Sequence, residues 1–290
     1  MKLYSYGKIN LFLDIKGKLP SGYHLIKTIM QSIDLHDEIY IDEISENKII
    51  IECSDKNIPT DNKNTCFKAA ELIKDIYKIN TGVKITINKL IPSEAGLAGG
   101  SGNSAAVLVG LNRLWNLTLT KEEIQSIGLK IGADVPFCLT GGTYLAEGIG
   151  EKLTKLKDFI WDNILVIKPD FNMSTAFVYS ELSKDKYNLY TENNIIAFIE
   201  NRSFTDVASS IANTLESVVE KIHPEINTIK DVMNMNNAVA AMMTGSGSAI
   251  YGLFPDKESM DTAYKILKKT YIKSFKTKTV NKGIELLTKS

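Results

Sequence analysis

The chain has 290 residues, with 34 basic and 34 acidic side chains and therefore no net charge. This balance gives no overall electrostatic attraction to nucleic acid or to an anionic membrane, and neither is expected as a partner. Hydrophobic residues make up 44% of the chain, which excludes a disordered protein and is enough to fill the cores of two packed domains.

The three cysteines, Cys53, Cys66 and Cys138, are odd in number and form no C-x-x-C pair. They predict free thiols in a reducing compartment rather than a disulfide framework. The N-terminal sequence MKLYSYGKINLFLDIKG is interrupted by Lys8 and Asp14, so it lacks the apolar stretch of a signal peptide. No apolar run approaches the ~20 residues of a membrane span. We therefore expect a cytoplasmic protein.

The first predicted elements are β-strands. Leu3–Leu13 alternates apolar with polar residues, and a period of two indicates a strand with one buried face. Helical spacing of apolar residues then predicts a helix over Cys66–Tyr77, followed by an alternating strand at Val83–Ile87. Between the first strand and this helix, further strands are expected at Ile26–Leu35, Glu38–Glu43 and Lys48–Cys53.

Two more helices are expected in the first half of the chain. Asn103–Trp115 is rich in helix-forming residues. Lys121–Lys130 is expected to form the second helix, because Thr120 can cap its N-terminus and Glu123 stands at the capping-box position. The glycines between residues 141 and 150 then predict a turn-rich β segment.

The second half of the chain mixes strands with helices. A charged stretch within residues 150–163 marks the expected boundary between a domain at 1–155 and one at 156–290. The mixed order predicts an α+β fold rather than a doubly wound parallel sheet. The elements expected beyond the boundary are a strand at Ile164–Ile167, helices between Thr175 and Met235, strands at Ala238–Met243 and Ala249–Phe254 around a turn at Gly245–Gly247, a helix at Lys257–Lys268 and a strand at Tyr271–Thr279.

The loop PSEAGLAGGSG, between a predicted strand and a predicted helix, suits a bound phosphate group. Its glycines permit positive φ angles and a close approach of the backbone to a ligand. Successive N–H groups can form an anion nest, to which the following helix adds its positive end. The loop follows neither the Walker A nor the Rossmann pattern, and a plain turn would use similar residues. The residues expected to bind phosphate are Pro92, Ser93, Glu94, Ala95, Gly96, Leu97, Ala98, Gly99, Gly100, Ser101 and Gly102.

Asp134 and Lys8 are candidate catalytic residues, each with an ordinary structural alternative. A carboxylate at Asp134, in the segment GADVPF, can take the proton of a substrate hydroxyl, but aspartate is also common in turns. Lys8 and Asn10 lie on one face of the first strand, opposite Ile9 and Leu11. A polar strand face is often merely solvated, so the residues alone leave both interpretations open.

Three segments together resemble the GHMP kinases, a family named for galactokinase and for homoserine, mevalonate and phosphomevalonate kinases. They are YGKINLFLDI near the N-terminus, PSEAGLAGGSGNSAA, and TGSGSAIYGLF from Thr244 to Phe254. The segments PSGYHLI and GADVPF also resemble a branch of the family whose substrate is a cytidine diphosphate derivative. The resemblance implies ATP-dependent phosphorylation of an alcohol hydroxyl with Mg²⁺. It also implies an S5-like N-terminal domain and a ferredoxin-like C-terminal domain around one cleft.

The resemblance assigns the catalytic pair and its neighbours. It implies that Asp134 is the general base and that Lys8 orients it and lowers the pKa of the substrate hydroxyl. Asn10 would contact the substrate hydroxyl groups, and Ser101 would bind phosphate or Mg²⁺. The loop Gly245–Gly247 would lie near the phosphates, although by itself it reads as a hairpin turn.

The same resemblance implies a binding site for the cytosine ring. Tyr23 would stack on the base, and His24 would recognise its polar edge. Tyr179 would supply the opposite aromatic face, although its helical spacing with Thr175 and Ala176 also fits core packing.

The sequence departs from the family pattern at four positions. Ala98 stands where a glycine is usual, and Gly102 stands where a second serine is usual. Thr214 replaces an aspartate, and Glu94 would repel a triphosphate unless it points away. We expect a working enzyme with an altered affinity for ATP.

Two alternatives remain open at the level of sequence. The first is another GHMP kinase, which acts on homoserine or on a mevalonate-type alcohol. The second is a nucleotide-binding regulator that has kept the fold without the chemistry. In each case the partner is a small molecule, and we expect a monomer or a weak homodimer.

Overall fold

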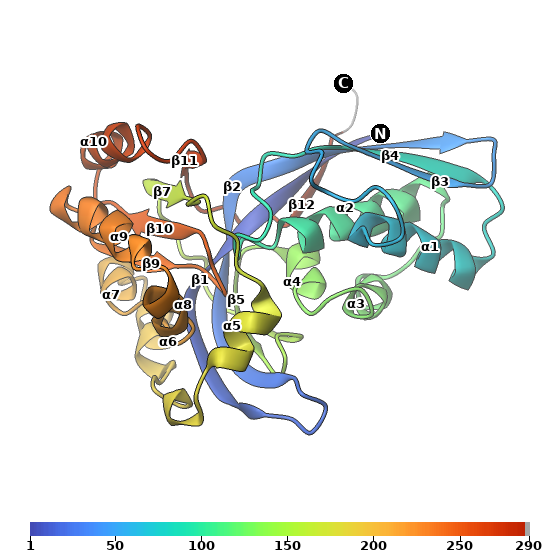
Figure 1. Cartoon of the computed structure of the whole chain (residues 1–290). Coiled ribbons are helices and arrows are strands. Elements are labelled where there is room, and N and C mark those ends of the chain that lie inside the picture. Colours follow the sequence, from blue (N-terminus) through green and yellow to red (C-terminus); the bar gives the residue numbers. More distant parts are fainter. Residues whose placement is uncertain (288–290) are drawn as a thin grey trace.

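The computed structural model describes residues 1–287. Its strands form two sheets, each with helices packed against it, so that the molecule has two lobes (Figure 1). Most strand pairs are antiparallel, which confirms the predicted α+β fold. None of the helices among these residues is long and apolar enough to cross a bilayer.

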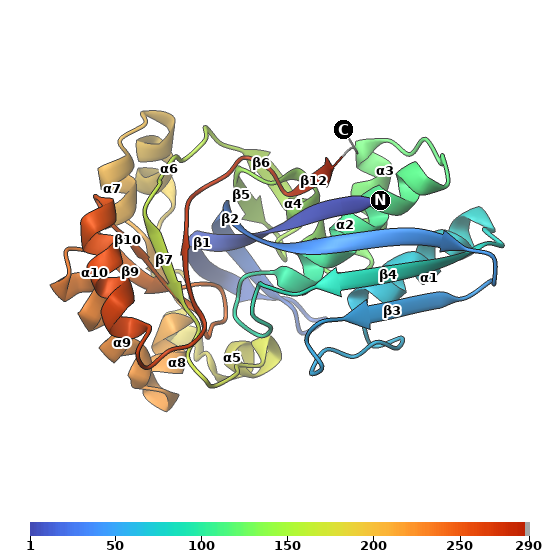
Figure 2. The ribbon, with the colours of Figure 1, turned by 90° about the horizontal axis from the view of Figure 1, so that it is seen from above.

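The larger sheet has eight strands and is built around a long hairpin. Its main order is β12-β1-β2-β4-β3, with β5, β6 and β8 attached at its sides. Seen from above, the hairpin of β1 and β2 runs between the two lobes (Figure 2). The strands are β1 (Lys2–Lys18), β2 (His24–Ile44), β3 (Ile49–Cys53), β4 (Gly82–Asn88), β5 (Thr143–Glu147), β6 (Lys152–Lys155), β8 (Ala212–Asn213) and β12 (Ile284–Leu287).

Helices α1 (Thr65–Tyr77), α2 (Gly99–Leu114), α3 (Lys121–Leu129) and α4 (Val135–Thr140) belong to the same lobe. Apolar side chains from these helices and from β2, β3 and β4 form one buried cluster. The capping box predicted for α3 is present, because the Thr120 side chain accepts the Glu123 N–H and the Glu123 carboxylate accepts the Thr120 N–H.

The second lobe contains an antiparallel sheet of four strands in the order β11-β7-β10-β9. Its central strands are buried on both faces, as expected for a sheet packed between helices and the other lobe. The elements are β7 (Ile164–Ile167), α5 (Thr175–Glu181), the 3₁₀-helix η1 (Lys184–Lys186), α6 (Asn193–Glu200), α7 (Phe204–Ser209), α8 (Glu216–Ile222), α9 (Glu225–Met235), β9 (Ala240–Met243), β10 (Ile250–Leu253), α10 (Lys257–Leu267) and β11 (Ser274–Thr277).

Several elements differ from the sequence-based expectations. The two strands predicted over Ile26–Glu43 are one continuous strand, β2, and helix α2 begins at Gly99 instead of Asn103. The short helix α4 and the strands β8 and β12 were not predicted. Both of these strands lie beyond residue 155 and pair with β1, so β1 contacts both halves of the chain.

The continuity of β2 has a specific role in placing the glycine-rich loop. Asp37, a fully buried residue of β2, accepts the N–H groups of Leu90 and Ile91 at 2.7 and 2.8 Å. It also pairs with the Lys89 ammonium group at 2.7 Å. These contacts hold the chain that leaves β4 against β2, directly before the loop begins.

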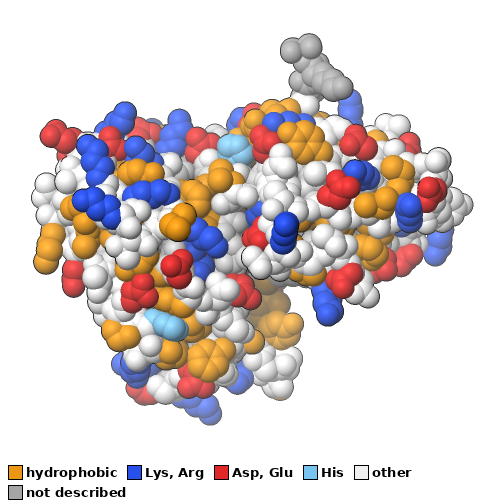
Figure 3. Space-filling view, turned by 45° about the horizontal axis from the view of Figure 1, so that its top comes forward, with side chains coloured by type: hydrophobic (Ala, Val, Ile, Leu, Met, Phe, Trp, Pro, Cys, Tyr) orange, Lys and Arg blue, Asp and Glu red, His pale blue; other side chains and the backbone are white. Residues whose placement is uncertain are grey.

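Charge is distributed over the surface without segregation between the lobes. Basic and acidic side chains both occur on each lobe of the face in Figure 3. This agrees with the equal numbers of the two signs in the sequence.

Candidate active site

A cavity of about 1260 Å³ lies at the meeting of the two lobes. Residues of β1, of the glycine-rich loop and of the segment just before α4 line it from the first lobe, and residues of α5 and of the loop after β9 line it from the second. All four kinds of predicted site residue meet here: the catalytic pair, the loop, the neighbour Asn10 and the aromatic residues. They include Lys8, Asn10, Tyr23, His24, Asp134 and Tyr179.

The glycine-rich loop is docked on the second lobe through its backbone. The Ser248 N–H donates to the Glu94 carbonyl at 3.3 Å, and the Ala249 N–H donates to the Ala95 carbonyl at 3.2 Å. The Ala95 and Leu97 side chains are buried in the apolar cluster that joins the lobes. The loop is therefore a fixed structure with an anchored backbone.

Gly96 stands at the closest approach between this loop and the second lobe. Its φ is +72°, and an added Cβ would lie 2.0 Å from the Thr244 carbonyl oxygen. Gly245 approaches from the other side, since an added Cβ there would lie 3.3 Å from the Lys8 Nζ. Only residues without a side chain allow the two loops to meet around the lysine.

Lys8 is buried beneath these loops, with 4% of its surface exposed. Its Nζ donates to the Gly96 carbonyl and to Asn10 Oδ1, each at 2.6 Å, and its N–H donates to the Leu97 carbonyl at 3.1 Å. Burial lowers the pKa of Lys8, and the nearby charge of Asp134 opposes that shift. In this structure, Lys8 thus holds the loop directly and acts on Asp134 only through its charge.

The Asp134 carboxylate is not used to cap the helix that follows it. It occupies the N-cap position of α4, yet its side chain makes no capping hydrogen bond. Pro136 follows near the start of the helix, where the missing N–H leaves one donor fewer to cap. The half-buried side chain lines the cavity, which weakens the view of Asp134 as a simple turn residue.

Asn10 serves chiefly as a positioning residue. Its Nδ2 donates to the Thr28 hydroxyl at 2.8 Å, while its Oδ1 accepts from Lys8 and from the Thr244 hydroxyl. Its backbone N–H also donates to the Thr244 hydroxyl at 3.0 Å. Most of its bonding capacity is therefore used inside the protein, although the side chain lines the cavity.

The end of the glycine-rich loop is helical, whereas the sequence predicted that the helix begins at Asn103. Ala98 has a φ of +56° and caps α2, so Gly99–Gly102 form the first helical turn. Gly102 is buried against Ser5, where an added Cβ would lie 2.6 Å from the Ser5 hydroxyl, and it does not line the cavity. This glycine therefore packs α2 onto β1 and stands apart from the loop residues that line the cavity.

The three residues predicted to bind cytosine all line the cavity. Tyr23, in the turn between β1 and β2, is 63% exposed, so its ring is free to stack on a ligand. The His24 and Tyr179 rings lie with their centroids 5.1 Å apart. Burial and the Lys18 charge lower the pKa of His24, which favours the neutral form of its ring.

Sequence reasoning missed the loop between β3 and α1. Thr65 donates a hydrogen bond from its hydroxyl to the Gly100 carbonyl at 3.1 Å, and the Asn64 side chain caps α1. The lining residues from this region are Asn57, Ile58, Pro59, Lys63, Asn64 and Thr65. Their only sequence signal is a polar, turn-forming composition before a capped helix, which has no specific chemical meaning.

Asn103 is a second residue that sequence reasoning missed. It lies in the first turns of α2, lines the cavity, and has a buried Oδ1 without a hydrogen-bond partner among residues 1–287. An orphaned buried acceptor is costly, so this atom is available to a ligand.

The unusual Thr214 has a clear structural explanation. Its hydroxyl donates to Asp14 Oδ1 at 2.6 Å, and Asp14 is fully buried. An aspartate at this position would place a second carboxylate beside the first. The neighbouring Asn213 and Glu216 still hold the strand β9 and its loop, through Met243 and the Gly245 carbonyl.

Two models of one kinase family match the sequence of this chain. The model of the GHMP kinases N terminal domain matches residues 64–142, and the model of the GHMP kinases C terminal domain matches residues 195–273. The chain therefore belongs to the GHMP kinases, and its two-domain fold is the one that the family resemblance implied.

Comparison with individual proteins shows to which branch of the GHMP kinases the chain belongs. A 4-diphosphocytidyl-2-C-methyl-D-erythritol kinase of Caldicellulosiruptor saccharolyticus is 50% identical over 89% of each chain, and one of Clostridioides difficile is 44% identical over 99% of this chain and 97% of its own. A crystal structure of 4-(cytidine 5'-diphospho)-2C-methyl-D-erythritol kinase is 25% identical, with a TM-score of 0.82 over 96% of this chain and 99% of its own. Within the GHMP kinases, the chain is a member of this branch.

The contact at Gly96 generates a prediction about stability. Gly96→Ala places a methyl group against the Thr244 carbonyl in a left-handed conformation, and we expect a loss of about 2–4 kcal/mol in the free energy of unfolding. Gly100→Ala is the matched control, since its Cβ would meet nothing closer than Thr65 Oγ1 at 3.6 Å. Urea unfolding measures both variants, and equal stability of the two would contradict the proposed contact.

Proposed function

We propose that the protein transfers the γ-phosphate of ATP to the 2-hydroxyl of 4-diphosphocytidyl-2-C-methyl-D-erythritol, a step of the non-mevalonate isoprenoid pathway. The observation that carries the proposal is the composition of one cavity. It combines a glycine-rich loop at a helix N-terminus, a buried lysine with a nearby free carboxylate, and a group of aromatic rings. Anion binding, proton transfer and base stacking are the three requirements of this reaction.

The chemistry assigned to the protein is mainly positioning and charge neutralisation. N–H groups of the loop and of the first turn of α2 would bind the β- and γ-phosphates. Asp134 would accept the proton of the substrate hydroxyl as the oxygen attacks the γ-phosphorus, while the bond from that phosphorus to the β,γ-bridging oxygen breaks and ADP leaves with the electron pair. Lys8, fixed by Gly96 and Asn10, would neutralise charge between the loop and Asp134.

Mg²⁺ is expected to accompany ATP, and the oxygen atoms that line the cavity suit it. The Ser101 hydroxyl, the Asn103 amide oxygen and the Asp134 carboxylate are hard ligands of the kind that Mg²⁺ prefers. No group of three or more His, Cys, Asp or Glu residues is arranged to hold a metal within residues 1–287. The phosphates would therefore supply much of the coordination, and the ion would offset their charge.

The two nucleotides are assigned to different walls of the cavity. Tyr23, His24 and Tyr179 would bind the cytosine of the acceptor. The loop at residues 57–65, which touches Gly100 through Thr65, would enclose the adenosine of ATP. This arrangement leaves the glycine-rich loop and Asp134 between the two bases.

The alternatives are less well supported. A homoserine or mevalonate kinase would have no use for the Tyr23 and His24 pair, and the relatives at 44–50% identity carry a different name. A regulator without catalysis would not need a free carboxylate beside a buried lysine. We further propose a cytoplasmic monomer or weak homodimer that binds neither nucleic acid nor membranes.

Substrate choice provides the direct test of the proposal. With Mg²⁺ and ATP present, the purified protein is expected to phosphorylate the cytidylyl substrate and to leave homoserine and mevalonate unchanged. Coupled measurement of ADP release checks all three alcohols in parallel. Turnover of homoserine or mevalonate in preference to the cytidylyl substrate would overturn the assignment.

Removal of the proposed base is expected to slow catalysis strongly without loss of substrate binding. Asp134→Asn keeps the shape of the side chain but cannot accept a proton, so kcat is expected to fall by about 10²–10⁴. Asp170→Asn, at an exposed carboxylate outside the cavity lining, is the matched control. An unchanged kcat in Asp134→Asn would refute the base assignment.

The exposed ring of Tyr23 is expected to contribute through stacking. Tyr23→Ala removes an aromatic face worth about 1–3 kcal/mol per base, so the KM for the cytidylyl substrate is expected to rise while the KM for ATP stays unchanged. Tyr23→Phe keeps the face and is expected to behave as wild type. Steady-state kinetics with each substrate varied in turn separates the two constants, and equal KM values in all three proteins would exclude stacking at this position.

A further inference from the structure

His24 is held between two tyrosines and leaves one ring nitrogen free. Its Nε2 lies 3.1 Å from the Tyr187 hydroxyl, and the two rings meet edge to face at 5.9 Å. The Tyr179 ring lies on another side at 5.1 Å. Among residues 1–287 only Tyr187 forms a hydrogen bond with the ring. Nδ1 is therefore available to a ligand in the cavity that the ring lines.

Tyr187 begins a segment that is fastened to the β1–β2 hairpin, and we call residues 187–192 the strap. The Asn188 N–H donates to the Ile15 carbonyl at 2.9 Å. The Lys16 ammonium group donates to the Tyr190 carbonyl at 2.9 Å and lies 3.9 Å from the Glu192 carboxylate. These contacts fix the backbone on both sides of Tyr190 and immediately after Tyr187.

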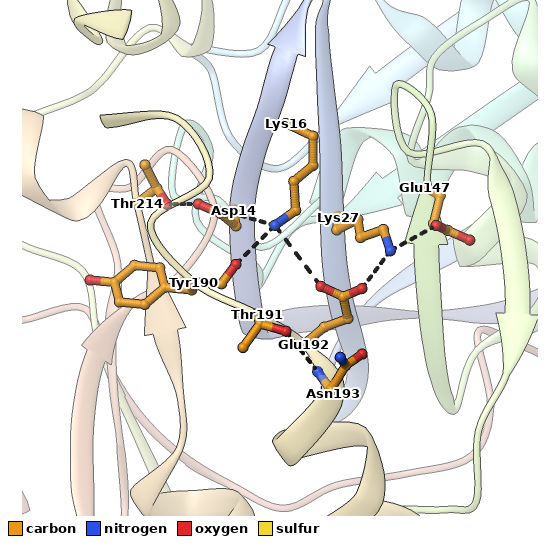
Figure 4. A network of polar contacts seen from close by, with 9 residues as sticks. All are labelled: Asp14, Lys16, Lys27, Glu147, Tyr190, Thr191, Glu192, Asn193 and Thr214. Atoms are coloured by element: carbon orange, nitrogen blue, oxygen red, sulfur yellow. Dashed lines mark hydrogen bonds and ion pairs between the residues drawn. The ribbon is translucent and has the colours of Figure 1, made fainter. Parts of the chain in front are cut away.

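Ion pairs attach the strap to both strands of the hairpin. Figure 4 shows the Glu192 carboxylate between Lys16 of β1 and Lys27 of β2. Lys27 also pairs with Glu147 of β5 at 3.4 Å, and Lys16 pairs with the buried Asp14 at 2.6 Å. The strap is thus bonded to the same hairpin that carries His24, so Tyr187 and His24 share one rigid frame.

A neutral imidazole carries one N–H donor and one acceptor, and the partner of one nitrogen decides the state of the other. A phenol is a better hydrogen-bond donor than an imidazole N–H, and an imidazole nitrogen is a better acceptor than a phenol oxygen. Tyr187 therefore donates to Nε2, and the ring proton resides on Nδ1. The free nitrogen becomes a donor.

We propose that Tyr187 is a positioning residue for substrate recognition, which sets His24 as an Nδ1–H donor to the pyrimidine base. This inference rests on the proposed function, since it assumes that the cavity binds cytosine beside His24. Cytosine presents a lone pair at N3, whereas uracil carries a hydrogen there. An Nδ1–H donor accordingly favours cytosine, and a ring free to change tautomer loses that preference.

Tyr187→Phe tests the proposal with a minimal change, because only the hydroxyl is lost. We expect the KM for the cytidylyl substrate to rise about three- to tenfold, as for the loss of one hydrogen bond, with kcat and the KM for ATP unchanged. The preference for the cytidylyl substrate over its uridylyl analogue is expected to fall. Tyr190→Phe is the matched control, because the Tyr190 hydroxyl forms no hydrogen bond within the described residues and the residue fastens the strap through its carbonyl.

Nitrogen-15 NMR provides a readout that does not depend on activity. The chain has three histidines, so the His24 signals can be assigned by comparison with a His24→Asn variant. We expect a single Nδ1–H tautomer in the wild type and in Tyr190→Phe, and a mixture in Tyr187→Phe. An Nε2–H tautomer in the wild type, or a tautomer and KM unaffected by Tyr187→Phe, would overturn the proposal.

The experiments distinguish an error in the proposed function from an error in the positioning role of Tyr187. If the wild type does not phosphorylate the cytidylyl substrate but the tautomer changes in Tyr187→Phe, the proposed function is wrong and the contact between Tyr187 and His24 stands. If turnover is normal and the tautomer does not respond, the positioning role is wrong and the proposed function stands.

Discussion

The hydrogen bond from the Lys8 ammonium group to the Gly96 carbonyl is the contact on which the active site depends. It joins β1 to the glycine-rich loop at the point where the loop meets the second lobe. Because the lysine is buried, its charge must be satisfied by protein oxygens, and the Gly96 carbonyl and Asn10 supply them. The bond therefore fixes three things together: the loop backbone, the position of the positive charge, and the distance of that charge from Asp134.

The β1–β2 hairpin connects this contact to the residues proposed to recognise the substrate. Lys8 lies in the middle of β1, while His24 lies at the beginning of β2, beyond the turn. Near that end, Lys16 and Lys27 bind the strap that presents Tyr187. The residues proposed for catalysis and for base recognition thus lie on one hairpin, whose strands pair from Lys2 to Lys18 with register shifts at three points. A rigid support of this kind keeps reacting groups at a fixed separation, which is the main requirement of phosphoryl transfer.

Two of the four positions that depart from the family pattern, Gly102 and Thr214, are explained by contacts inside the protein. Gly102 lets α2 approach Ser5 on β1, and the Thr214 hydroxyl donates a hydrogen bond to the buried carboxylate of Asp14. Ala98 adopts the left-handed conformation that caps α2, at the modest cost that a Cβ imposes there. None of these changes removes Lys8 or Asp134 from the cavity.

The sequence alone determined the α+β class, most helices and strands, and the identity of the site segments, because periodicity, capping and the YGKINLFLDI and GADVPF motifs are local properties. Tertiary structure decided the rest. Only folding shows that Gly102 faces Ser5, that the loop at residues 57–65 joins the cavity, and that Tyr187 reaches His24 across 163 positions of sequence. Such contacts leave no periodic or compositional trace, since each depends on how two distant segments meet in space.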